Sequence, residues 1–112
     1  YIRGRGLTEL TALGNLISMK IQTSGGDEFL FLLAETDLNG ALVFCERLKK
    51  IFEQKVFEYD HIQINVSLTF GVAEYDPIEG YKESIKNADD ALLNGKNNGR
   101  NKVVAFMGKP SL

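Results

Sequence analysis

Several things are scarce in this chain, and each scarcity excludes a class of protein. The single cysteine, Cys45, excludes an internal disulfide framework and permits a reducing compartment. No apolar run approaches the length of a membrane span, and no signal peptide is visible. Thirteen basic and fifteen acidic residues leave a net charge of −2, which argues against binding nucleic acid or anionic membranes through bulk charge. We therefore expect a cytoplasmic segment, whose parent can carry sensory or membrane parts elsewhere.

The length of the chain and its first residue indicate a single, incomplete domain. At 112 residues the chain is long enough for one hydrophobic core. It begins at Tyr1 rather than at methionine, so we expect a piece of a longer protein. The expectation is one domain over residues 1–112 that is incomplete at its N-terminus.

Hydrophobic periodicity predicts helices and strands that alternate along the chain. Leucines at helical spacing predict a short helix over about residues 7–16, and a β-hairpin follows over 17–35. A helix should begin after the Thr36-Asp37 cap and run to about Gln54. One apolar stripe marks its buried face: Leu38, Ala41, Leu42, Cys45, Leu48, Ile51 and Phe52.

The second half of the chain continues in the same manner. Alternation over 62–70 predicts a half-buried strand that Gly71 interrupts, and residues 56–59 could form a short edge piece. His61 should lie in a turn or on the surface. After a turn at Asp76-Pro77, a helix is expected over 79–97 with Gly99 as its left-handed cap, and then a strand over 103–107. The order predicts an α+β fold (an α/β sandwich), with one sheet and helices packed against it.

The stretch Gly25-Gly26-Asp27-Glu28-Phe29 stands between the two strands of the predicted hairpin. Adjacent glycines permit a tight reversal of bare backbone, which a phosphate can approach closely. Carboxylates beside such a turn can hold a divalent metal between protein and phosphate. Taken alone, the string is more often an ordinary Gly-Gly hairpin with solvated acids.

Two further strings follow the first in a characteristic order: Val66-Ser67-Leu68-Thr69-Phe70-Gly71-Val72-Ala73, and Ala88-Asp89-Asp90-Ala91-Leu92 running into Lys96-Asn97-Asn98-Gly99-Arg100-Asn101. Together the three strings resemble the GGDEF family of diguanylate cyclases over roughly residues 6–107. The chain departs in detail: three residues separate Ser67 from Gly71, and Leu93 and Gly95 stand where the family usually has Tyr and Ala. The resemblance implies a fold related to the polymerase palm and to nucleotidyl cyclases.

The resemblance also implies a reaction. Two GTP molecules would condense to cyclic di-GMP with release of pyrophosphate, assisted by Mg²⁺ or Mn²⁺. Each of two facing domains would hold one GTP, so the partners expected are GTP and a second GGDEF domain in a homodimer. Neither nucleic acid nor a membrane is an expected partner of this segment.

Site residues follow from the matching positions. The resemblance implies that Asp27 is the metal-binding catalytic carboxylate, with Glu28 in a supporting catalytic role. The backbone of Gly25 and Gly26 would lie near the nucleotide phosphates, and Lys96 and Arg100 would hold the terminal phosphates from one side of a helix end. The alternative for that pair is a solvated helix terminus with cations at the negative end of its dipole. Asp89 is interpreted as a structural contact and Asp90 as part of a solvated face.

The chain lacks the family's N-terminal strand and its D-x-D-x-F-K-x-x-N-D motif, which supplies a metal-binding Asp and a guanine-binding Asn. A second guanine anchor is replaced by Leu7. In the family the missing strand lies between the second strand of the hairpin and a later strand. Its loss would leave the apolar strand at 29–34 as an unpaired, aggregation-prone edge. Truncation, donation of a strand by another chain, and rearrangement of the sheet are the three explanations.

Three functions remain open from the sequence. The parent is a diguanylate cyclase, of which this chain by itself is expected to be inactive. Alternatively, the chain is a degenerate, inactive GGDEF module that binds GTP or a protein partner and regulates another activity. A more distant reading is a palm-like cyclase or polymerase module that acts on another nucleotide.

Overall fold

The computed structural model describes residues 16–23 and 26–108. The predicted helix over 7–16 lies outside these residues except for Leu16, which begins a strand. The elements are β1 (Leu16–Thr23), β2 (Glu28–Ala34), α2 (Leu38–Gln54), β3 (Val56–Tyr59), β4 (Ile62–Asn65), β5 (Leu68–Glu74), α3 (Tyr81–Asn97) and β6 (Val103–Ala105). No helix within the described ranges is long and apolar enough to cross a membrane.

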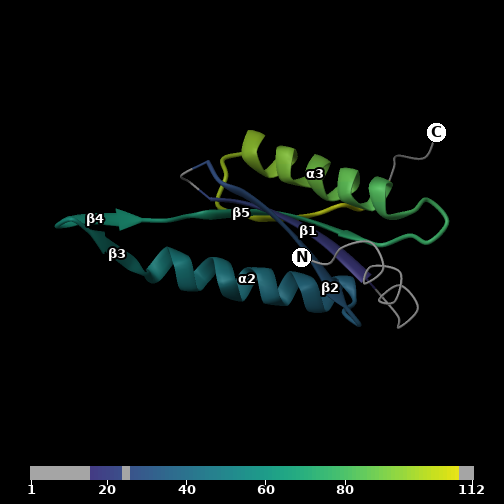
Figure 1. The fold of residues 1–112 in the computed structure, drawn as a ribbon, viewed down its shortest axis with the longest axis horizontal. Helices are drawn as coiled ribbons and strands as arrows, with labels where there is room; N and C mark the ends of the chain where they lie inside the picture. The colour runs from purple at the N-terminus through teal and green to yellow at the C-terminus, as the bar shows by residue number, and fades with distance from the viewer. Residues whose placement is uncertain (1–15, 24–25, 109–112) are drawn as a thin grey trace.

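Four strands form the main sheet in the order β2-β1-β5-β6. The hairpin strands β1 and β2 are antiparallel, β1 is antiparallel to β5, and β5 is parallel to β6. Helices α2 and α3 lie on the two sides of this sheet (Figure 1). The α+β sandwich predicted from the sequence is confirmed.

The main core lies between the sheet and α2. Ile17, Met19 and Ile21 alternate along β1 and are buried against Ala41 and Cys45 of the helix. The Cys45 thiol donates a hydrogen bond to the Met19 sulfur at 3.0 Å. Burial, with a smaller contribution from Glu46, raises the pKa of Cys45 to about 12. Cys45 is therefore a small core residue, as the sequence predicts.

Helix α2 has the predicted boundaries, and its cap explains its start. The Asp37 side chain accepts a hydrogen bond from the Gly40 N–H at 2.7 Å, which satisfies one of the free donors of the first turn. The predicted stripe is wrong at one position, since Ile51 is half exposed. The sheet does not extend far enough to cover this last part of the helix, where only the β3–β4 hairpin follows.

Helix α3 packs directly on the backbone of β5. A Cβ atom at Gly71 would lie 2.9 Å from the Leu92 Cα and still closer to the Ala88 carbonyl oxygen and the Leu92 amide nitrogen. The prediction that Gly71 interrupts the strand is therefore wrong. Gly71 allows the helix to approach, and β5 continues to Glu74 with both faces buried.

The single strand expected over 62–70 is in fact two strands. Residues 62–65 form β4, which pairs with β3 in a separate hairpin, while β5 begins at Leu68 in the main sheet. Asp60 and His61 both have positive φ values, as a two-residue turn of this hairpin requires, so His61 is a turn residue as expected. The alternating Ile62 and Ile64 are exposed rather than half-buried, because no element of the sheet covers them.

The β3–β4 hairpin is an arm that projects beyond the sheet (Figure 1). Its register places Phe57 opposite Ile64 and Tyr59 opposite Ile62, so these four share one face. At the base of the arm, Phe57 stacks on Phe52 of α2 with ring centroids 5.8 Å apart. Farther out, Tyr59 is 76% exposed.

The position of β1 bears on the missing family strand. β1 lies between β2 and β5, the place that the family gives to its first strand. β2 is an edge strand among the described residues, with Phe29 and Phe31 exposed. The rearranged sheet, one of the three explanations, is what the described residues adopt, and the expected unpaired apolar edge is present.

Candidate functional site

The described part of the β1–β2 hairpin loop is Gly26 and Asp27, and backbone hydrogen bonds close the turn. The Thr23 N–H donates to the Asp27 carbonyl and the Gly26 N–H donates to the Thr23 carbonyl, both at 3.0 Å. Gly26 has φ +95°, which glycine adopts without strain. A Cβ atom at Gly26 would meet no described atom within 4 Å, so none of the described residues beyond its chain neighbours fills the space beside the turn. Gly25, the other predicted backbone contact, lies outside the described residues.

The two carboxylates after the turn have different surroundings. Asp27 is exposed, and its side chain makes no hydrogen bond or ion pair with the described residues. Glu28 begins β2 and lies between two ammonium groups. One carboxylate oxygen is 3.6 Å from the Lys20 nitrogen, and the other is 3.8 Å from the Lys96 nitrogen. The structure thus joins Glu28 to Lys96, while no described residue pairs with Asp27.

Lys96 and Arg100 are positioned by different parts of the chain. Lys96 lies in the last turn of α3, which ends at Asn97. The sequence predicted both side chains on one side of a helix end, but Arg100 lies beyond the helix. Gly99, Arg100 and Asn101 all have positive φ values, and this left-handed turn reverses the chain. The Arg100 guanidinium then donates to the Gln22 side-chain oxygen at 3.5 Å.

The turn that carries Arg100 is held by the sheet. The Arg100 N–H donates to the Gly95 carbonyl and the Asn101 N–H donates to the Thr69 hydroxyl, each at 2.9 Å. Thr69 is buried in β5. Two consecutive non-glycine residues at positive φ are strained, and such strain persists only where surrounding contacts fix it. The rigid placement of Arg100 therefore depends on β5 and the end of α3.

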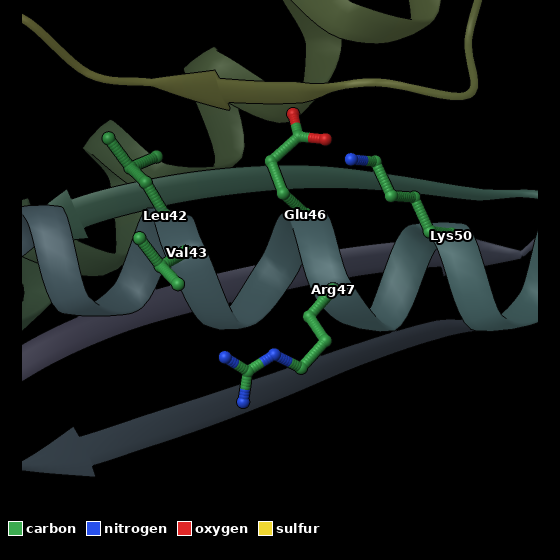
Figure 2. Close-up of a pocket in the computed structure, with 5 residues that line it drawn as sticks. All are labelled: Leu42, Val43, Glu46, Arg47 and Lys50. Atoms are coloured by element: carbon green, nitrogen blue, oxygen red, sulfur yellow. The ribbon is translucent and has the colours of Figure 1, made fainter.

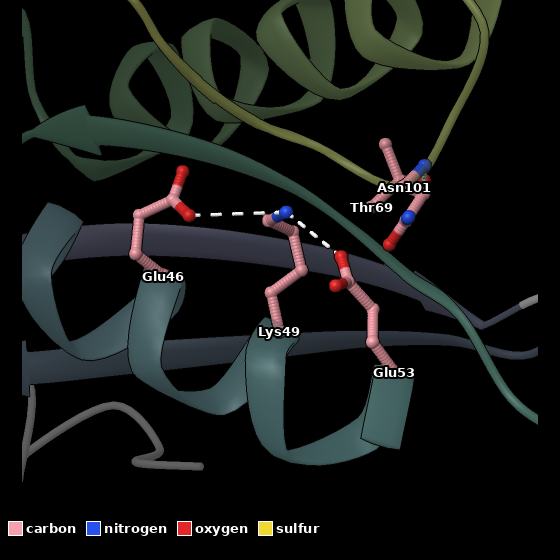
Figure 3. A network of polar contacts seen from close by, with 5 residues as sticks. All are labelled: Glu46, Lys49, Glu53, Thr69 and Asn101. Carbon is pink, nitrogen blue, oxygen red and sulfur yellow. Dashed lines mark hydrogen bonds and ion pairs between the residues drawn. The ribbon is translucent and has the colours of Figure 1, made fainter. Parts of the chain in front are cut away.

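A neighbouring polar network ties α2 to the same region. Figure 3 shows Lys49 between Glu46 and Glu53, with Thr69 and Asn101 close by. The Lys49 ammonium is 2.9 Å from Glu53 and 3.8 Å from Glu46. The hydrogen bond from Lys49, and to a lesser degree one from Asn101, lower the pKa of Glu53. The network supports the loop that holds Arg100.

Asp89 and Asp90 behave as the sequence indicates. Asp89 is 3.9 Å from the Lys20 nitrogen, a contact between α3 and β1. Asp90 pairs with Lys86 one helical turn away, on an exposed face. The sequence reasoning missed Lys20 and Gln22, although their signal was present: both occupy the polar positions of the alternating strand pattern.

The metal expected from the family is not matched by a complete ligand set. Within the described ranges, no group of three His, Cys, Asp or Glu side chains could hold a metal ion. Asp27 offers one carboxylate, and Glu28 is engaged by two lysines. These residues alone do not fit a divalent cation, which needs further oxygen ligands from substrate or from another part of the protein.

A surface depression of about 420 Å³ lies elsewhere, on α2. Figure 2 shows its lining residues, Leu42, Val43, Glu46, Arg47 and Lys50, all on that one helix. It contains none of the predicted site residues, and α2 covers the opposite face of the sheet from α3 (Figure 1). The charged end of the hairpin is therefore the better candidate for a functional site.

Comparison with known proteins finds a matching family model and several similar sequences. A family model described as "Diguanylate cyclase, GGDEF domain" matches residues 17–102. Diguanylate cyclase A of Treponema denticola is 40% identical over 81 residues, which are 71% of this chain and 22% of that protein. Diguanylate cyclase DgcM of Escherichia coli K12 is also 40% identical over 81 residues, 72% of this chain and 19% of that protein. The chain thus spans about a fifth of the length of these curated relatives.

The fold comparison reaches the same group of proteins. The GGDEF domain of DgcB from Caulobacter crescentus, whose crystal structure is in complex with c-di-GMP, superposes with a TM-score of 0.81. The match covers 91% of this chain and 81% of that domain, at 14% sequence identity. At this identity the likeness shows the fold alone.

Proposed function

The chain belongs to the GGDEF domain family, and we propose on that premise that its parent is a diguanylate cyclase of cyclic di-GMP signalling. The parent would condense two GTP molecules to cyclic di-GMP. One observation carries the proposal: the glycine turn with Asp27 and Glu28 meets the basic end of α3 at one end of the sheet. This arrangement supplies open backbone, carboxylate and cations where a triphosphate tail would lie.

In this proposal the chain's own residues bind and orient the nucleotide. Lys96 and Arg100 neutralise the β- and γ-phosphates, and the open backbone at Gly26 lets the phosphates come close. Phosphoryl transfer depends mainly on positioning and on neutralisation of charge, so a rigidly held Arg100 suits the task. The 3′-hydroxyl of one GTP would attack the α-phosphorus of the other, and pyrophosphate would leave.

The divalent metal of the family would be Mg²⁺ or Mn²⁺, with Asp27 as the ligand that this chain contributes. The remaining oxygen ligands must come from the phosphates and from residues outside those described. Each domain would hold one GTP, so catalysis requires a second GGDEF domain, and we propose a homodimer. Because GTP is an intracellular nucleotide, we propose a cytoplasmic location for this segment.

The first experiment incubates the chain with GTP and Mg²⁺ and detects cyclic di-GMP by mass, beside an Asp27→Ala variant. We expect no product from the chain alone, and product from the parent that depends on Asp27. A parent without activity under the same conditions would refute the proposal. Product from the isolated chain would show that the missing carboxylate and guanine anchors are dispensable or are supplied by a second copy.

One observation favours a second candidate, an inactive module that binds nucleotide or a protein partner and regulates another activity. The described residues hold no complete metal site, and the position of one guanine anchor is Leu7. A phosphate grip without base recognition would bind GTP and ATP alike. Equal affinities for the two nucleotides would favour this candidate, whereas selective binding of GTP would favour the cyclase.

A further inference from the structure

Lys20 lies at the phosphate end of the site, the end that holds Glu28 and Lys96, although it belongs to no motif. It lies on β1, opposite Leu30 of β2 and Gly71 of β5 in the two registers. Its neighbours Met19 and Ile21 face the α2 core, so Lys20 faces α3. The side chain is only 21% exposed, and its nitrogen is 3.6 Å from Glu28 and 3.9 Å from Asp89. This lysine is positioned by the middle of the sheet rather than by a surface loop.

Glu28 occupies the space between the cations. Its two oxygens face Lys20 on one side and Lys96 on the other, at 3.6 and 3.8 Å. These separations are longer than a charge-assisted hydrogen bond, and the Glu28 side chain is 40% exposed. Such a carboxylate can rotate into solvent at small cost, because solvent-exposed ion pairs are weak. A phosphate group of the same charge can then take its place.

Displacement of Glu28 from between the two lysines would leave three cations facing two carboxylates, and that excess of positive charge favours an anion. Lys20, Lys96 and Arg100 supply three positive charges, and among the described residues the Arg100 guanidinium is bonded only to the neutral amide of Gln22. The facing carboxylates are Asp27, Glu28 and Asp89, of which Glu28 lies between two of the cations. Among the described residues a divalent cation would find no complete ligand set here, and the two lysines already neutralise Glu28.

We propose that Lys20 is a third phosphate-binding cation beside Lys96 and Arg100, and that Glu28 occupies the phosphate position until a nucleotide binds. Binding of the phosphates then requires no metal ion. The proposal rests on the proposed nucleotide-binding function and specifies its chemistry. The ligand is the polyphosphate tail of a nucleotide, and its negative charge is neutralised by three side chains rather than by a cation shared with carboxylates. Metal would then be needed for chemistry and not for binding.

The test uses inorganic tripolyphosphate as the probe and measures its affinity for the 112-residue chain by calorimetry, with EDTA and separately with Mg²⁺. We expect binding in EDTA. Lys20→Met, which keeps the length of the side chain, should weaken binding about tenfold, as the loss of one charge-assisted contact does. Lys20→Arg should retain binding. Glu28→Gln should tighten it several-fold, roughly the inverse of a weak ion pair with each lysine.

A matched control is available on the same helix that carries Lys96. Lys86 is 63% exposed and pairs with Asp90. Lys86→Met removes the same charge and should leave the affinity unchanged. Circular dichroism on each variant establishes that the fold is retained, and the Lys20→Arg variant separates loss of charge from loss of structure.

The outcomes separate the inference from the function on which it rests. Binding of tripolyphosphate that requires Mg²⁺, or a Lys20→Met variant that binds like the wild type, would overturn the inference while the nucleotide-binding function stands. If neither tripolyphosphate nor GTP binds with or without Mg²⁺, the proposed function itself fails, and the inference fails with it.

Discussion

Replacing Gly71 with alanine should force helix α3 away from the sheet. The added methyl carbon would lie 2.9 Å from the Leu92 Cα and closer still to the Ala88 carbonyl oxygen and the Leu92 amide nitrogen. All three obstructing atoms belong to the helix backbone, so no side-chain rotation can relieve the clash. The helix must move, and it takes with it the buried contacts of Leu92 and the placement of Lys96.

The cost follows from overpacking. Inserted methyl groups in well-packed cores usually destabilise by about 1–3 kcal/mol, and rigid backbone obstruction places this site at or above the upper end. We expect the free energy of unfolding of Gly71→Ala to fall by about 3 kcal/mol, a large share of the ~5–15 kcal/mol typical of a domain. For a chain of this size the melting temperature should drop by roughly 10 °C or more. Denaturant titration and thermal melting measure both.

Gly95→Ala is the matched control on the same interface. Its added carbon would lie 2.9 Å from the Thr69 methyl and 3.3 Å from a Val104 methyl, so side-chain atoms rather than backbone atoms would have to give way. Alanine also favours a helix by about 1 kcal/mol over glycine. We expect a net change within about 1 kcal/mol of zero, since these effects oppose each other. If Gly71→Ala were as stable as Gly95→Ala, the reasoning about backbone contact would be refuted.

Three further predictions concern the helix cap, the buried thiol and the sheet edge. Asp37→Ala should lower the free energy of unfolding by about 1 kcal/mol by removing the cap of α2, whereas Asp37→Asn should retain most of it; equal losses would contradict the cap. The thiol of Cys45 ionises near 9 when unfolded and near 12 when buried, so stability should fall as the pH rises from about 9 to about 12, by up to about 1.4 kcal/mol per pH unit. Denaturation of Cys45→Ala over the same range should lack this component, and an identical slope would count against it. Phe31→Lys should reduce concentration-dependent association in light scattering, because a charge on the exposed strand β2 disfavours edge pairing; unchanged association would exclude that edge as its source.

Periodicity located the elements well wherever local pattern and burial agree. Helix α2 combines a cap, an apolar stripe and a polar face, and its limits are as predicted. The prediction over 62–70 was wrong because alternation reports two distinguishable faces and not which element covers them. Ile62 and Ile64 alternate as a half-buried strand would, yet they lie on a projecting hairpin. Strand order is not a local property, so the position of β1 beside β5 could not be read from the sequence.

The candidate site was predictable where it follows a motif and not where it follows tertiary contact. The glycine turn, Lys96 and Arg100 were identified from ordered strings. Lys20 was not, because its role depends on β1 lying beneath α3, and only the fold brings Glu28 and Asp89 to it. Arg100 reaches the site through a left-handed turn, which helical spacing could not indicate.

The projecting arm has a consequence for the order in which the molecule opens. The β3–β4 pairing is local in sequence, and four of its eight residues form an apolar face that, among the described residues, has a ring contact at Phe57 alone. Segments with so little burial exchange their amide hydrogens through opening that costs far less than global unfolding. In a hydrogen-exchange experiment the arm should therefore lose protection as one early unit, while β1 and β5 remain protected to the last. The β3–β4 arm would then open while the pairing of β1 with β5, which positions the candidate site, stays intact.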